Sequence, residues 1–89
     1  PDVRDPLSHA LDEALAACAD AAHRGLARTS PGLRERIARA GKDLEANGLR
    51  TAAETVNALA AALTADDPHR AVRAWATAHI RLLTTAELR

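Results

Sequence analysis

The sequence predicts an all-α fold, a small antiparallel four-helix bundle, from its length, its composition and the spacing of its apolar residues. The chain has 89 residues, which is the size of one domain. Alanine and leucine, which both favour helices, account for 35 of them. Valine and isoleucine total five, and phenylalanine, tyrosine and methionine are absent, so a β-sheet core is disfavoured. Finally, apolar residues recur at steps of three and four in four segments that short breaks separate.

The first helix is expected over residues 6–27. Asp5 is a suitable N-cap, and Pro6 suits the first helical position. One apolar stripe then runs along the helix through Leu7, Leu11, Ala14, Leu15, Cys18, Ala22 and Leu26.

The second helix is expected over residues 31–46. Ser30 and Pro31 repeat the pairing of an N-cap with a proline, and Asn47 and Gly48 form a typical C-terminal stop. The inner stripe consists of Leu33, Ile37, Ala40 and Leu44.

The third helix is expected over residues 50–64. Thr51 and Glu54 have the spacing of a capping box. The inner stripe of this segment, the most apolar of the chain, consists of Ala52, Val56, Leu59, Ala60 and Leu63.

The fourth helix is expected over residues 67–85, with Asp67 and Pro68 at its start. Its predicted inner face consists of Val72, Trp75, Ala76, His79, Ile80 and Leu83. The connections between the four segments are only two to five residues long, which makes neighbouring helices antiparallel. Alanine on the inner faces predicts close packing of the helix axes.

Charge is balanced overall but uneven along the chain. Residues 1–23 carry a net charge of −4 and residues 24–50 a net charge of +4. We interpret this as an acidic first helix that faces a basic second helix. The alternative is a basic ridge that binds an acidic partner or phosphate, formed by Arg28, Arg34, Arg36, Arg39 and Lys42.

The residues predict neither a catalytic site, nor a cofactor, nor a metal site. Phosphate-binding glycine motifs, a nucleophile elbow and zinc-binding motifs are absent from the sequence. Cys18 stands alone, so it cannot form an internal disulfide or a cysteine-based zinc site. Its place on the apolar stripe favours a buried residue over a nucleophile. We therefore do not expect an enzyme.

Trp75 and His79 each have two interpretations. Trp75 is the only aromatic residue, and it either fills the widest part of the core or anchors a partner. His79 lies beside the inner stripe, either as a flanking side chain or as a group that contacts a ligand. The candidate partner-binding residues are Trp75, His79, Arg34, Arg36, Arg39 and Lys42.

Three stretches resemble the alanine-rich helical segments that flank the zinc finger of actinobacterial SWIM proteins. These are KDLEANGL at 42–49, LAAAL at 59–63, and RAW at 73–75 together with RLLTTAEL at 81–88. The cysteines and histidine of that zinc finger have no counterpart here, so metal binding does not carry over. The resemblance implies an accessory helical module of an intracellular multidomain protein.

The sequence as a whole favours a non-catalytic helical module for protein interaction or scaffolding. The partner would be another protein, the rest of a longer parent chain, or a second copy in a homodimer. Neither a membrane nor nucleic acid is favoured, and the absence of a secretory signal at residues 1–5 indicates a cytoplasmic location. Two alternatives stay open: a ligand-binding or sensory bundle around Trp75 and His79, and a nucleic-acid-binding domain that uses the basic second helix.

Overall fold

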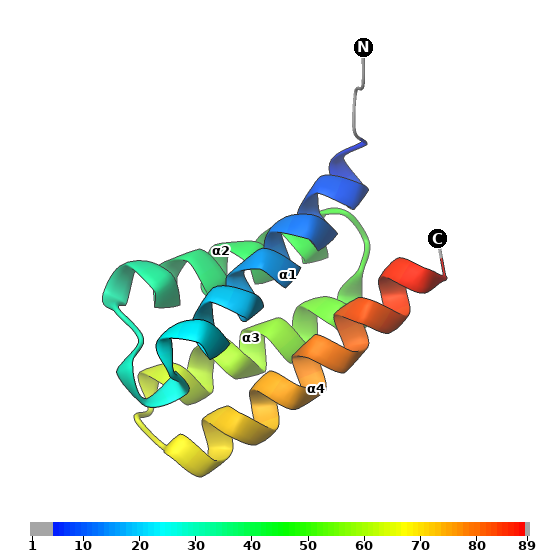
Figure 1. The fold of residues 1–89 in the computed structure, drawn as a ribbon. Helices are drawn as coiled ribbons and strands as arrows, with labels where there is room; N and C mark the ends of the chain where they lie inside the picture. Colours follow the sequence, from blue (N-terminus) through cyan, green and yellow to red (C-terminus); the bar gives the residue numbers. More distant parts are fainter. Residues whose placement is uncertain (1–4, 89) are drawn as a thin grey trace.

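The computed structural model describes residues 5–88 and confirms the predicted antiparallel four-helix bundle (Figure 1). The helices are α1 (Pro6–Arg24), α2 (Pro31–Ala46), α3 (Arg50–Thr64) and α4 (Pro68–Glu87). A short 3-10 helix, η1 (Leu26–Arg28), follows α1. Nearly all of the N-terminal stretch that was compared with a secretory signal lies outside the described residues.

The four helices contact one another in a ring. α2 packs on α3, α3 on α4, and α1 closes the ring against both α2 and α4. α1 begins and α4 ends at the same end of the bundle (Figure 1). More than half of the buried hydrophobic residues among 5–88 are alanines. The largest fully buried side chains are Ile37, Leu44, Leu59 and Leu82, so a few large residues in a setting of small ones form the core.

Three of the predicted N-caps are confirmed. The carboxylate of Asp5 accepts a hydrogen bond from the Ser8 amide at 2.7 Å, and the hydroxyl of Ser30 accepts one from the Leu33 amide at 3.1 Å. Asp67 accepts one from the Arg70 amide at 3.1 Å. Each cap is followed by a proline at the start of its helix, where the missing N–H costs no helical hydrogen bond.

The predicted capping box at Thr51 is wrong. α3 begins at Arg50, so Thr51 already lies in the first turn, and Leu49 stands at the cap position without a side-chain hydrogen bond. Gly48, at φ +81°, reverses the chain and lets Leu49 donate its amide to the Leu44 carbonyl at 2.9 Å. The closure of α2 therefore sets the start of α3.

Two helix ends also differ from the expectation. α1 ends at Arg24 rather than near residue 27, because Gly25 adopts φ +93° and the chain continues as η1. α4 starts at Pro68 and continues to Glu87, two residues beyond the expected end.

The predicted inner face of α4 is wrong for its aliphatic residues, although Trp75 does pack against the core. The residues that α4 buries are Ala71, Ala78 and Leu82, whereas Val72, Ile80 and Leu83 are exposed. α4 has two apolar arcs, and the one with the smaller residues faces the bundle because alanine lets the helix lie close to its neighbours.

α2 and α3 approach each other closely at Gly41. Gly41 is buried in the middle of α2, and a Cβ atom there would lie 3.6 Å from the Asn57 backbone nitrogen and in conflict with the Asn57 side chain. A residue without a side chain therefore allows this contact, which accords with the tight small-residue packing predicted from the composition.

Candidate functional site

The most exposed large hydrophobic residues among 5–88 all belong to α4 or its C-cap. The exposed fractions are 54% for Val72, 64% for Ile80, 44% for Leu83 and 82% for the C-cap residue Leu88. Single exposed hydrophobic residues are common on protein surfaces, but a group on one helix indicates a surface that binds something.

Val72, Ile80 and Leu83 share one side of α4 with Ala76 and His79. We call this surface the exposed α4 face; it comprises Val72, Ala76, His79, Ile80 and Leu83. Steps of three and four residues place its members along one side of the helix. Sequence reasoning named all five residues on the predicted inner face, and of these five it considered only His79 for partner binding. The overlooked signal was the second arc, formed by Ala71, Ala78 and Leu82, which is equally helical in its spacing.

Trp75 joins the exposed α4 face to α1. Its indole Nε1 donates a hydrogen bond to the backbone carbonyl of Cys18 at 2.8 Å. Its ring stacks on His79, with ring centroids 4.8 Å apart and an angle of 10° between the planes. Both residues are half-buried. Trp75 therefore lies at the edge between α1 and α4 rather than in the widest part of the core.

The Nδ1 atom of His79 is buried and makes no hydrogen bond among the described residues. The ring is held by its stack on Trp75. A buried polar atom without a partner lowers stability by about 1–3 kcal/mol. His79 thus lies where the exposed α4 face borders Trp75.

Two apolar residues of α1 stand near Cys18, whose carbonyl accepts the hydrogen bond from Trp75. Leu15 is half-buried and packs against the core, as Trp75 does, whereas Ala22 is exposed. The α1 side of the contact with α4 is therefore partly apolar.

The predicted basic ridge is only partly free. Arg36 Nε bonds to Glu13 Oε1 at 2.9 Å, and Arg36 also pairs with Asp20, so α2 and α1 are joined by their opposite charges. Hydrogen bonds with Asp20 and then Glu13 raise the pKa of Arg36. Because all three side chains are a third to a half exposed, each pair contributes less than about 1 kcal/mol.

The other basic candidates take no part in this pairing with α1 among the described residues. Arg34 donates to the Thr29 carbonyl at 2.8 Å, which ties α2 to the loop before it. Arg39 and Lys42 are exposed on the outer side of α2. Hence the structure brings Trp75 and His79 together but does not join them to the four basic candidates, which lie on another helix.

Cys18 is buried, as the apolar stripe of α1 predicts. Its exposed fraction is 1%, and burial raises the pKa of the thiol from 9.0 to about 11. The nucleophilic form of cysteine is the thiolate, which this environment disfavours. The residue acts as a small apolar side chain of the core.

This burial predicts a loss of stability in alkali. Below pH 9 the thiol is protonated in both the folded and the unfolded chain, so it has no effect on the pH dependence. Between pH 9 and about 11 the unfolded chain releases its proton while the folded chain keeps it, so stability falls as pH rises. We expect a decrease of about 2–3 kcal/mol in the free energy of unfolding from this group.

Urea denaturation at pH 8, 9, 10 and 11 measures this decrease. Cys18→Ala is the control, because it removes the thiol and keeps a small apolar side chain. The difference between the two pH profiles isolates the thiol from every other group that titrates in this range. Parallel profiles would contradict the prediction.

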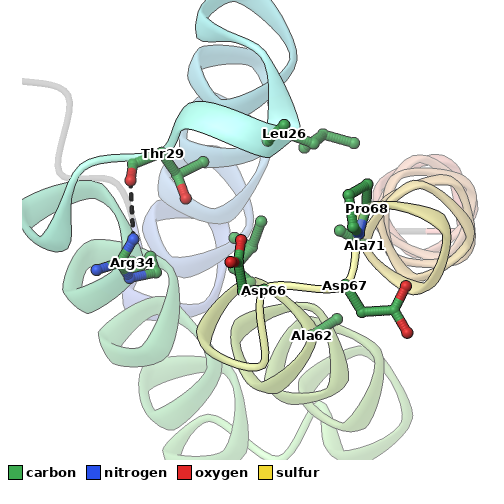
Figure 2. A pocket seen from close by; sticks show the side chains of 10 residues that line it. Leu26, Thr29, Arg34, Ala62, Asp66, Asp67, Pro68 and Ala71 are labelled. Carbon is green, nitrogen blue, oxygen red and sulfur yellow. Dashed lines mark hydrogen bonds between the residues drawn. The ribbon is translucent and has the colours of Figure 1, made fainter.

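Trp75 and His79 line none of the four best-defined pockets among the described residues. One lies at the end of the bundle where η1, α2 and the α3–α4 loop meet (Figure 2). Its volume is only about 30 Å³, enough for a water molecule. Arg34 lies in its wall and is turned to Thr29 (Figure 2).

The largest of the four is an open, shallow groove between α3 and α4. Glu54, Thr55 and Ala58 line it from α3, and Arg70, Arg73, Ala74 and Thr77 line it from α4. It contains neither a nucleophile with a base nor a set of converging metal ligands. Within residues 5–88, no group of three histidine, cysteine, aspartate or glutamate side chains is placed to hold a metal ion.

No helix in the described part of the chain combines the length and the apolar character needed to cross a bilayer. Comparison with known proteins gave no match: no family model, no curated protein and no solved structure is significantly similar to this chain. The exposed α4 face is therefore the feature from which a function can be inferred.

Proposed function

We propose that this chain is a non-catalytic helical interaction module that binds a protein partner through the exposed α4 face. The observation that carries the proposal is the exposure of Val72, Ile80 and Leu83 on one helix of a chain whose remaining large side chains are mostly buried. Contact with another protein removes such side chains from water, at a gain of about 25 cal/mol per Å² of apolar area.

The chemistry of the rest of the surface agrees with a module of this kind. Charges are balanced overall, and the net basic charge of the second helix is partly neutralised by Glu13 and Asp20. Trp75 and His79 are stacked on each other rather than arranged around a cavity. No specific observation thus favours the nucleic-acid-binding or ligand-binding alternatives.

The partner class includes another protein, the rest of a parent chain and a second copy of this chain. The resemblance to helical segments beside SWIM zinc fingers supports an accessory role of the same kind, in the cytoplasm. The exposed α4 face would be the contact in each case.

Site-specific photo-crosslinking tests the proposal in the cells that produce the protein. A benzophenone amino acid at position 80 should yield a discrete adduct with a protein, because Ile80 is the most exposed member of the exposed α4 face. The matched control is position 77, where Thr77 is exposed on another side of the same helix. Equal adducts, or none, from both positions would refute the proposal.

A further inference from the structure

The exposed α4 face repeats with the period of a coiled-coil seam. Four of its members, Val72, Ala76, His79 and Leu83, are continued by Ala86 beyond the face, and together they follow one another at alternating steps of four and three. Such spacing is the a/d pattern by which one helix meets another along a continuous line. All five are at least partly exposed, so this line is open over about four turns of α4.

This seam is complementary to itself when two copies of α4 run antiparallel. With a two-fold axis beside His79, Val72 lies opposite Ala86 of the second copy, and Ala76 lies opposite Leu83 of the second copy. Each larger aliphatic side chain then meets an alanine, which lets the two surfaces interdigitate. A two-fold interface requires this kind of self-complementarity.

The charges beside the seam have the same symmetry. Arg73, Ile80 and Glu87 follow at intervals of seven, so they lie along one flank of the seam. In an antiparallel two-fold pair this flank faces the same flank of the second copy. Arg73 of each copy then lies opposite Glu87 of the other copy, which gives two such pairs. The two Ile80 side chains meet near the axis. Neither Arg73 nor Glu87 has an ion pair within the described residues.

We infer that the chain self-associates through α4 as an antiparallel two-fold dimer. The inference rests on the proposed function, since it names a second copy as the protein that the exposed α4 face binds. A standard interface buries about 800 Å² on each partner, and a single helix seam is smaller, so the dimer is weak. Its dissociation constant belongs in the micromolar range or above.

Sedimentation velocity of the whole chain tests this inference from about 10 µM to about 1 mM, where weak dimers dissociate. The mass is expected to rise from 9.4 kDa toward twice that value. Ile80→Glu places two carboxylates near the axis and should keep the chain monomeric throughout. Thr77→Glu, at an exposed position off the seam, should leave the rise intact; circular dichroism confirms that both variants are folded.

Charge exchange tests the antiparallel register. Arg73→Glu or Glu87→Arg alone sets like charges opposite each other twice and should weaken association about tenfold, since exposed pairs contribute tenths of a kcal/mol to 1 kcal/mol each. The double variant restores two opposite-charge pairs and should recover the association. A double variant no better than the single ones would overturn the register and with it the inference.

A mass that stays at 9.4 kDa up to about 1 mM would overturn the dimer, as would a rise that Ile80→Glu does not abolish. These outcomes would refute the dimer, and the cross-linking experiment separates them from a failure of the proposed function. A monomeric chain whose position 80 still cross-links to a different protein refutes self-association and leaves the interaction module standing. A monomeric chain without any specific adduct at position 80 refutes both.

Discussion

Leu59→Ala is expected to lower the free energy of unfolding by about 3–4 kcal/mol, near the middle of the range for such changes. Leu59 is fully buried in α3, the helix that packs on both α2 and α4. More than half of the buried hydrophobic residues among 5–88 are alanines, which have no rotamers with which to fill the space that the substitution leaves. A domain of this size has a total stability of about 5–10 kcal/mol, so the loss is a large share of it.

Urea denaturation followed by circular dichroism measures the change. Leu88→Ala is the matched control, because it removes the same atoms from a side chain that is 82% exposed and should alter stability by less than about 0.5 kcal/mol. If Leu59→Ala were as mild as Leu88→Ala, the core would be able to collapse around the missing side chain, and the account of a rigid alanine-rich core would be wrong.

The parts of the fold that were predictable depend on local signals. Asp5, Ser30 and Asp67 each stand before a proline and a helical stripe, and each caps its helix as expected. Capping involves residues three apart in the chain, so the sequence contains all the information that it needs. Short connections then leave antiparallel packing as the simple arrangement of four helices.

Features that depend on contacts between helices were harder to predict. Thr51 has the spacing of a cap, but the turn at Gly48 starts α3 one residue before it. On α4, both apolar arcs have helical period, and hydrophobicity alone favours the arc with the larger side chains. Packing decides otherwise, because Ala71 and Ala78 allow a close approach that Val72 and Ile80 would prevent.

The candidate site was missed for the same reason. Val72, Ile80 and Leu83 were interpreted as core residues, and only Trp75 and His79 of that group were considered for binding. Their exposure is a property of how α4 is rotated in the bundle, which no short stretch of sequence determines. An excess of apolar residues over what one helix face can bury is the sequence signal that would have identified a second surface.

Trp75→Ala is expected to lower the free energy of unfolding by about 3 kcal/mol, the lower end of the range for large aromatic residues because Trp75 is only half-buried. Three contacts are lost together: apolar contact at the edge between α1 and α4, the stack on His79, and the hydrogen bond from Nε1 to the Cys18 carbonyl. Trp75→Phe separates them. It keeps one aromatic ring for packing and stacking, removes the donor and loses the smaller part of the indole, so we expect a loss of about 1–2 kcal/mol.

The comparison of these two variants decides what holds α4 against α1. Urea denaturation followed by circular dichroism is the measurement, since both variants lack the only fluorescent indole of the chain. If Trp75→Phe were as damaging as Trp75→Ala, the hydrogen bond to Cys18 would dominate and the ring would add little. If both variants cost less than about 0.5 kcal/mol, Trp75 would have no structural role and would be free to act as a partner anchor. The expected result, a small loss for Phe and a large one for Ala, makes Trp75 the residue whose ring holds α4 with its second apolar arc turned toward solvent.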